Sequence, residues 1–184
     1  MRKGVLEEKG EEMNMFNRLL LFATLFIVSC SGWTYNGISG EDLRAGGVKE
    51  YAQMIGGGVL SAGVHLAGHA LAYQAYGVSW HLDGLTEMAE ERMSDSEAAM
   101  IGRAGPLLQL AVGYGMKWAG IDNAFTRGYN TVTLLEIGTY PAVDSFNGGG
   151  SDLDMIDRDS DAGAEWIVYT GLAAGLNYNR RKEQ

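Results

Sequence analysis

Two histidines four positions apart give this sequence its clearest chemical signal. His65 and His69 lie in an apolar stretch, with the letters HLAGH between residues 65 and 69. On an α-helix, side chains at i and i+4 project from one face, so the two imidazoles can share a metal ion. Two histidines, a carboxylate from elsewhere in the chain and an open position for water make a catalytic zinc site. The spacing therefore predicts a metal site, and the alternative is a pair of structural histidines without metal.

The residue after the first histidine argues against hydrolysis. Zinc peptidases with the motif H-E-x-x-H carry a glutamate there, which takes a proton from the zinc-bound water and later returns one to the leaving amine. This chain has Leu66 instead. Loss of a general base lowers the rate by about 10²- to 10⁴-fold. A substitute base would have to come from another part of the chain, and the candidates are Glu87, Glu90, Glu91 and Glu136.

The histidines must be positioned by a long apolar helix. Residues 51–78 contain no Asp, Glu, Lys or Arg, and the three glycines at 56–58 indicate close packing against another helix. About 20 such residues cross the hydrocarbon core of a bilayer, so this segment is the best candidate span. The alternative is a buried core helix of a soluble bundle. The mean hydropathy of −0.08 is lower than a multi-span membrane protein would show.

The remainder of the chain predicts further helices. Ser94 and Glu97 have capping-box spacing, which starts a helix expected to continue to Trp118. Residues 81–95 before it are polar and indicate a connection. Residues 130–143 and 164–178 are apolar enough for two more helices, and Pro141 is expected to break the first of these near its end. The sequence thus predicts an all-α, membrane-associated bundle of about three to four helices, with one domain at residues 51–179.

These segments resemble the site-2 protease family of intramembrane zinc metalloproteases. Residues 65–78 look like its motif H-E-x-G-H-A-L-A-x-x-x-x-G-V, apart from Leu66. Residues 104–110, AGPLLQL, resemble its A-G-P-L-x-N-L segment, with Gln109 where asparagine is usual. The family's third metal ligand is an aspartate near a proline or glycines, which implies Asp152, in a Gly-Ser-Asp setting, or alternatively Asp144. The resemblance covers residues 56–156.

The resemblance implies a zinc site formed by His65, His69 and Asp152, in a protein that lacks the catalytic glutamate. We therefore expect a site-2 protease-like membrane protein that is proteolytically inactive and retains metal binding. Its expected partners are membrane lipid and transmembrane helices of other proteins. Two alternatives stay open: an active intramembrane metallopeptidase with a non-standard general base, and a non-enzymatic envelope lipoprotein.

The amino-terminal region has the layout of a targeting signal. An apolar run at residues 19–28 follows Arg18 and precedes Cys30, the only cysteine, in a sequence similar to a bacterial lipobox. Residues 1–30 are thus predicted to be a signal peptide or lipoprotein signal, with Met13 or Met15 as alternative starts, and residues 31–50 a polar linker. An uncleaved signal anchor is the alternative. The expected location is the bacterial cell membrane or envelope, with a lipid anchor at Cys30.

The charge excludes a nucleic-acid partner. The chain of 184 residues has a formal net charge of −9. Binding to phosphates needs clustered lysine and arginine, and the basic residues cluster only in the short tail at 180–184.

Overall fold

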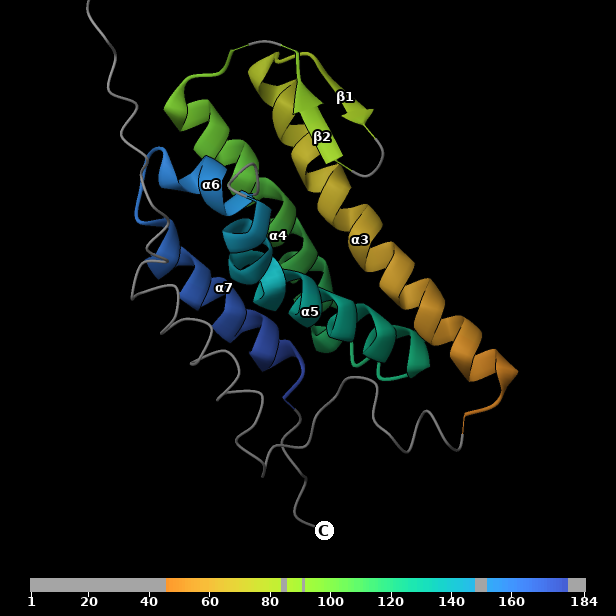
Figure 1. Cartoon of the computed structure of the whole chain (residues 1–184). Helices are drawn as coiled ribbons and strands as arrows, with labels where there is room; N and C mark the ends of the chain where they lie inside the picture. Colours follow the sequence, from red (N-terminus) through yellow and green to blue (C-terminus); the bar gives the residue numbers. More distant parts are fainter. Residues whose placement is uncertain (1–45, 84–85, 91, 148–151, 179–184) are drawn as a thin grey trace, which may run out of the picture.

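The computed structural model describes residues 46–83, 86–90, 92–147 and 152–178, and within them five helices and one small sheet (Figure 1). In chain order these elements are α3 (Val48–Tyr76), β1 (Trp80–Asp83), β2 (Thr86–Ala89), α4 (Asp95–Trp118), α5 (Ala124–Asn147), α6 (Asp152–Asp157) and α7 (Ala162–Leu176). The predicted all-α class is confirmed, and the short α6 raises the number of helices above the expected three to four. The predicted signal segment with Cys30, most of the linker and the basic tail lie outside the described residues.

The helices form layers, with α4 and α5 lying between α3 on one side and α7 on the other (Figure 1). Helix α3 packs along both α4 and α5, and α6 packs mainly on α4. The apolar core lies where α4, α5, α6 and α7 meet, and it includes Trp166, Ile137 and Ile156, each fully buried. The layer of α4 and α5 therefore connects this core to the helix that carries both histidines.

Helix α3 comes very close to α5, as the glycines at 56–58 predict. A Cβ atom added at Gly57 would collide with the backbone of Phe125 in α5. A larger side chain at this position would push the two helices apart. The absence of a side chain thus fixes the distance between α3 and the middle layer.

Helix α5 continues through Pro141 to Asn147, so the predicted break at this proline is wrong. A proline inside a helix has no N–H to donate to the carbonyl four residues earlier. That carbonyl belongs to Ile137, and it accepts a hydrogen bond of 2.7 Å from the indole Nε1 of Trp166 in α7. A side chain from another helix replaces the missing backbone donor, which a local reading of the sequence does not reveal.

The connection between α3 and α4 contains a two-stranded antiparallel sheet, in which Trp80 pairs with Ala89 and Asp83 with Thr86. The sequence predicted only a polar connection here. The predicted start of α4 is confirmed, because the Ser94 side chain accepts from the backbone of Glu97 and the Glu97 side chain accepts from that of Ser94. This capping box satisfies backbone donors that the first turn of a helix leaves free.

An ion pair joins α4 to α7. Arg103 donates from Nε and Nη2 to the two carboxylate oxygens of Glu165, each at 2.8 Å, and Nη2 also donates to Ser160 Oγ at 2.7 Å. The hydrogen bonds from Arg103 lower the pKa of Glu165 to about 2, against the opposing effect of burial. This two-point contact holds the amino-terminal half of α4 beside α7.

The bond from Trp166 to the Ile137 carbonyl leads to a stability prediction. Trp166→Phe keeps most of the buried aromatic surface but leaves a buried carbonyl without a donor, which costs about 1–3 kcal/mol. Unfolding in denaturant, followed by circular dichroism, should show this loss of stability. Trp118→Phe is the matched control, because Trp118 is 86% exposed. Equal stability of the two variants would contradict this account of the proline in α5.

Candidate metal centre

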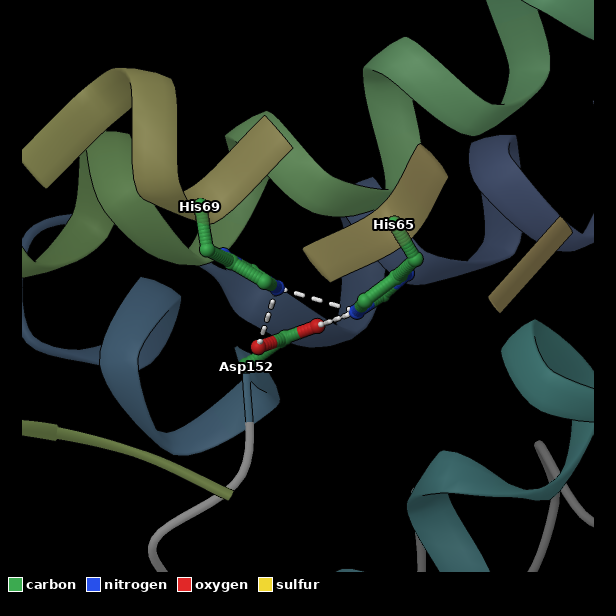
Figure 2. Close-up of side chains that lie close together, drawn as sticks. All are labelled: His65, His69 and Asp152. Carbon is green, nitrogen blue, oxygen red and sulfur yellow. Dashed lines mark hydrogen bonds and ion pairs between the residues drawn. The ribbon is translucent and has the colours of Figure 1, made fainter. Parts of the chain in front are cut away.

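Three buried side chains from two helices converge on one point (Figure 2). His65 and His69 project from one face of α3, and their Nε2 atoms lie 2.9 Å apart. Asp152, the first residue of α6, places Oδ2 at 3.0 Å from His65 Nε2 and Oδ1 at 3.2 Å from His69 Nε2. The three residues each offer a ligand atom within 4.8 Å of the others, and the group could hold a metal ion.

The close approach of α3 and α4 places the ring of His69. A Cβ atom at Gly105 in α4 would collide with this imidazole. On its other nitrogen, Nδ1, the ring lies 2.8 Å from the backbone carbonyl of Ile101, also in α4. A carbonyl oxygen only accepts hydrogen bonds, so Nδ1 carries a proton, and in the neutral ring Nε2 presents a lone pair to the shared point.

The ring of His65 is oriented by Gln109, a buried residue of α4. His65 Nδ1 lies 3.3 Å from Gln109 Oε1. The amide nitrogen of Gln109 donates to Ser61 Oγ at 2.7 Å and to Glu136 Oε2 at 2.8 Å. Because a carboxylate only accepts, the amide nitrogen must face Glu136, which turns the amide oxygen toward His65. His65 Nδ1 is therefore a donor, and its Nε2 also presents a lone pair to the shared point.

The shared point is thus surrounded by acceptors. Two lone pairs at 2.9 Å repel each other unless a proton or a cation lies between them. Asp152 Oδ2 is buried and lies 3.0 Å from His65 Nε2, which can donate to it only when that nitrogen is protonated. Burial of a polar atom without a partner is costly. Both features fit a bound cation, which would accept electron pairs from all three residues.

The carboxyl group of Asp152 is ionised, as a ligand of a cation must be. Burial opposes its charge, but hydrogen bonds and positive charge from the imidazoles of His65 and His69, when these are protonated at Nε2, outweigh this effect and lower the pKa of Asp152 to about 2. The group is therefore an anion across the ordinary pH range. Its balancing charge comes either from protons on the Nε2 atoms or from a metal, which displaces those protons.

The structure brings together the three residues that the sequence singled out first, and metal binding by them stays a prediction. The alternative ligand Asp144 belongs to α5, and its side chain is outside the described residues. Of the four candidate bases, Glu90 pairs with His81 at the exposed hairpin, where its Oε1 lies 3.5 Å from His81 Nδ1. The side chains of Glu87 and Glu91 are not among those described. The carboxylate of Glu136 accepts a hydrogen bond from the side-chain amide of Gln109.

Sequence reasoning missed three residues of the immediate surroundings. It noted Gln109 only as a departure from an asparagine, and it gave no role to Ser61. It missed Tyr140, whose hydroxyl lies 3.1 Å from His65 Nε2. The signal for Tyr140 was its position one helical turn after Glu136, which places both on one face of α5. Only the packing of α5 against α3 shows that this face meets the histidines.

Comparison with known proteins adds no relative: no family model, curated protein or solved structure matches the chain.

The orientation of His65 by Gln109 leads to a prediction on metal affinity. Gln109→Leu removes the acceptor that holds the His65 proton on Nδ1, and loss of such an outer partner typically weakens metal binding about 10- to 100-fold. A competition titration against a chromophoric zinc chelator measures the effect. Gln74→Leu, at an exposed position on the same helix as the histidines, is the control and should bind like the wild type. Equal affinities for the two variants would show that Gln109 does not orient the ligand.

Proposed function

We propose that this protein is a zinc-binding membrane protein of site-2 protease type that holds its metal without hydrolysing peptide bonds. One observation carries the proposal. The Nε2 atoms of His65 and His69 and the carboxylate of Asp152 meet at a buried point, and hydrogen bonds on the far side of each ring turn their lone pairs inward. Such outer bonds fix the tautomer and raise the basicity of metal-bound histidines.

The donor set supports zinc. Two imidazoles and one carboxylate are the protein ligands of many catalytic zinc sites, and neutral nitrogens with one anionic oxygen suit this borderline ion. The same three donors also form the facial triad of non-haem iron(II). Elemental analysis separates the two metals, so the proposal can fail on the identity of the metal alone.

The surroundings of the site support the absence of hydrolysis. Leu66 occupies the position of the general base, and an aliphatic side chain neither takes nor returns a proton. Glu136 is no substitute, because Gln109 separates it from His65 and contacts the ring at Nδ1, away from the Nε2 side. Among the described residues, Asp152 is the acidic member of the group whose ligand atoms lie within 4.8 Å of one another.

The character of α3 supports a place in the membrane. By length and composition, α3 qualifies as a membrane span, and only 33% of its most apolar window is buried inside the protein. The core helix of a soluble bundle would bury most of such a window. Large apolar side chains instead face outward, among them Ile55 and Val59, each 68% exposed. An exposed apolar surface of this kind fits contact with lipid or with a partner helix.

Metal analysis of the purified full-length protein tests the proposal directly. We expect about one zinc per chain in the wild type and nearly none after His65→Ala, because two remaining ligands hold zinc weakly. His81→Ala is the matched control, since His81 lies on the exposed hairpin and should leave the zinc content unchanged. Equal, near-zero zinc in all three proteins would overturn the proposal and favour the non-enzymatic envelope lipoprotein. Iron in place of zinc would overturn the assigned metal.

A cleavage assay tests the proposed lack of hydrolysis. Zinc-loaded wild-type protein and His65→Ala, each reconstituted in liposomes with a panel of membrane-spanning peptides, should give the same background rate. Mass spectrometry of the peptides detects new termini. Zinc-dependent cleavage by the wild type that disappears in His65→Ala would contradict the proposal and support the active peptidase with a non-standard base.

A further inference from the structure

We propose that Tyr140 supplies a fourth ligand, so that its hydroxyl oxygen and the three residues above form a closed four-coordinate metal site. The inference rests on the proposed metal binding and goes beyond it, because it assigns a residue and a coordination type. It starts from one contact. The Tyr140 hydroxyl lies 3.1 Å from His65 Nε2, the nitrogen that faces the shared point.

The separations measured from His65 Nε2 suit one corner of a tetrahedral shell. Donors at the usual zinc distances lie about 3.3 Å from one another in a tetrahedron. Here the separations between His65 Nε2 and its three neighbours are 2.9 Å to His69, 3.0 Å to Asp152 and 3.1 Å to Tyr140. The phenol oxygen is thus as far from this ligand atom as the other two donors are.

Packing on both sides holds the phenol ring in this place. The ring stacks on His65, with centroids 5.9 Å apart and planes at 17°. Its other neighbour is Trp166, which meets it edge-on at 5.2 Å and is fully buried. Trp166 is itself tied to the backbone of α5 through the Ile137 carbonyl, one turn before Tyr140. The hydroxyl is therefore directed to the site by the same contact that repairs α5 at Pro141.

The charge of the site supports coordination by the phenol oxygen. A hydroxyl beside His65 Nε2 can donate to it only while that nitrogen has a free lone pair, and a bound metal uses that lone pair. On coordination, the O–H bond would break, the proton would leave to solvent and an oxygen–metal bond would form, with no change in oxidation state. Two anionic oxygens, from Asp152 and Tyr140, then balance a divalent cation, so the buried site is neutral.

A closed shell also agrees with Leu66. Catalytic zinc sites keep one position for water, whereas structural sites fill all four with protein ligands. Where a tyrosine takes the place of water, no water remains for a general base to activate. A site with four protein ligands therefore accounts both for the phenol beside His65 and for the absence of a glutamate at position 66.

Tyrosine absorption tests the proposal in the full-length wild-type protein. On titration with zinc, the ultraviolet difference spectrum should show the band of about one tyrosinate per bound metal, with zinc binding followed separately by chelator competition. Tyr140→Phe should lose this band and bind zinc about 10- to 100-fold more weakly. Tyr169→Phe is the matched control, because Tyr169 also packs edge-on against Trp166 but donates to Glu165. It should keep both the band and the affinity.

Cobalt(II) in place of zinc gives a second measurement. The visible spectrum of the wild-type cobalt form should not respond to azide, because no coordination position is open, whereas that of Tyr140→Phe should shift. If the wild type binds zinc without a tyrosinate band, or its cobalt form binds azide, the fourth ligand is overturned and the proposed metal binding stands. If the wild type binds no metal at all, the proposed function itself fails. The wild-type spectra need no substitution, so misfolding of a variant leaves the test intact.

Discussion

The structure depends on one electrostatic constraint: three groups that carry lone pairs or negative charge meet at a point from which water is excluded. His65, His69 and Asp152 are each less than a tenth exposed. Like-charged or electron-rich atoms at such distances repel in a medium of low dielectric constant. The arrangement is stable only if protons or a cation occupy the point. Hydrogen bonds at Nδ1 of both histidine rings direct their Nε2 atoms toward this point.

The helical scaffold enforces this constraint through a continuous set of hydrogen bonds. Gln109 links the histidine ring to Ser61 in α3 and Glu136 in α5. The hydroxyl of Ser61 lies 2.9 Å from that of Thr133, and the Gln109 carbonyl accepts from the Tyr129 hydroxyl at 2.8 Å. Helices α3, α4 and α5 are thus connected through buried polar groups with few alternative partners. Networks of this kind tolerate little displacement, so the orientation of the His65 ring is coupled to the packing of the bundle.

Local sequence patterns predicted the parts of this arrangement that depend on local chemistry. Four-residue spacing placed His65 and His69 on one helix face, and the capping box located the start of α4 at Ser94. The prediction at Pro141 failed, because the donor that repairs the helix comes from Trp166, 25 positions later in the chain and in another helix. Tyr140 was missed for the same reason. Its role depends on which helices are neighbours, and spacing along one helix does not contain that information.

The placement of Asp152 shows how the two kinds of information combine. The family resemblance favoured Asp152, in its Gly-Ser-Asp setting, and kept Asp144 as the alternative. In the structure, Asp152 begins α6, whose Leu153 and Ile156 are buried, and α6 packs on α4. Apolar anchors therefore hold a short helix that delivers one anionic side chain to the histidines.

Stability alone does not account for such a site. A buried carboxylate and two buried imidazoles cost free energy unless each is paired, and apolar residues of similar volume would fill the same space at lower cost. The surrounding bundle has ample apolar side chains of this size on α3 itself. Protons or a cation at the point would turn their mutual repulsion into attraction, and the polar groups there agree with the proposed binding of a metal. Under the proposed function, Leu66 leaves a site whose electrostatics would hold a metal but which lacks the group that would use it for hydrolysis.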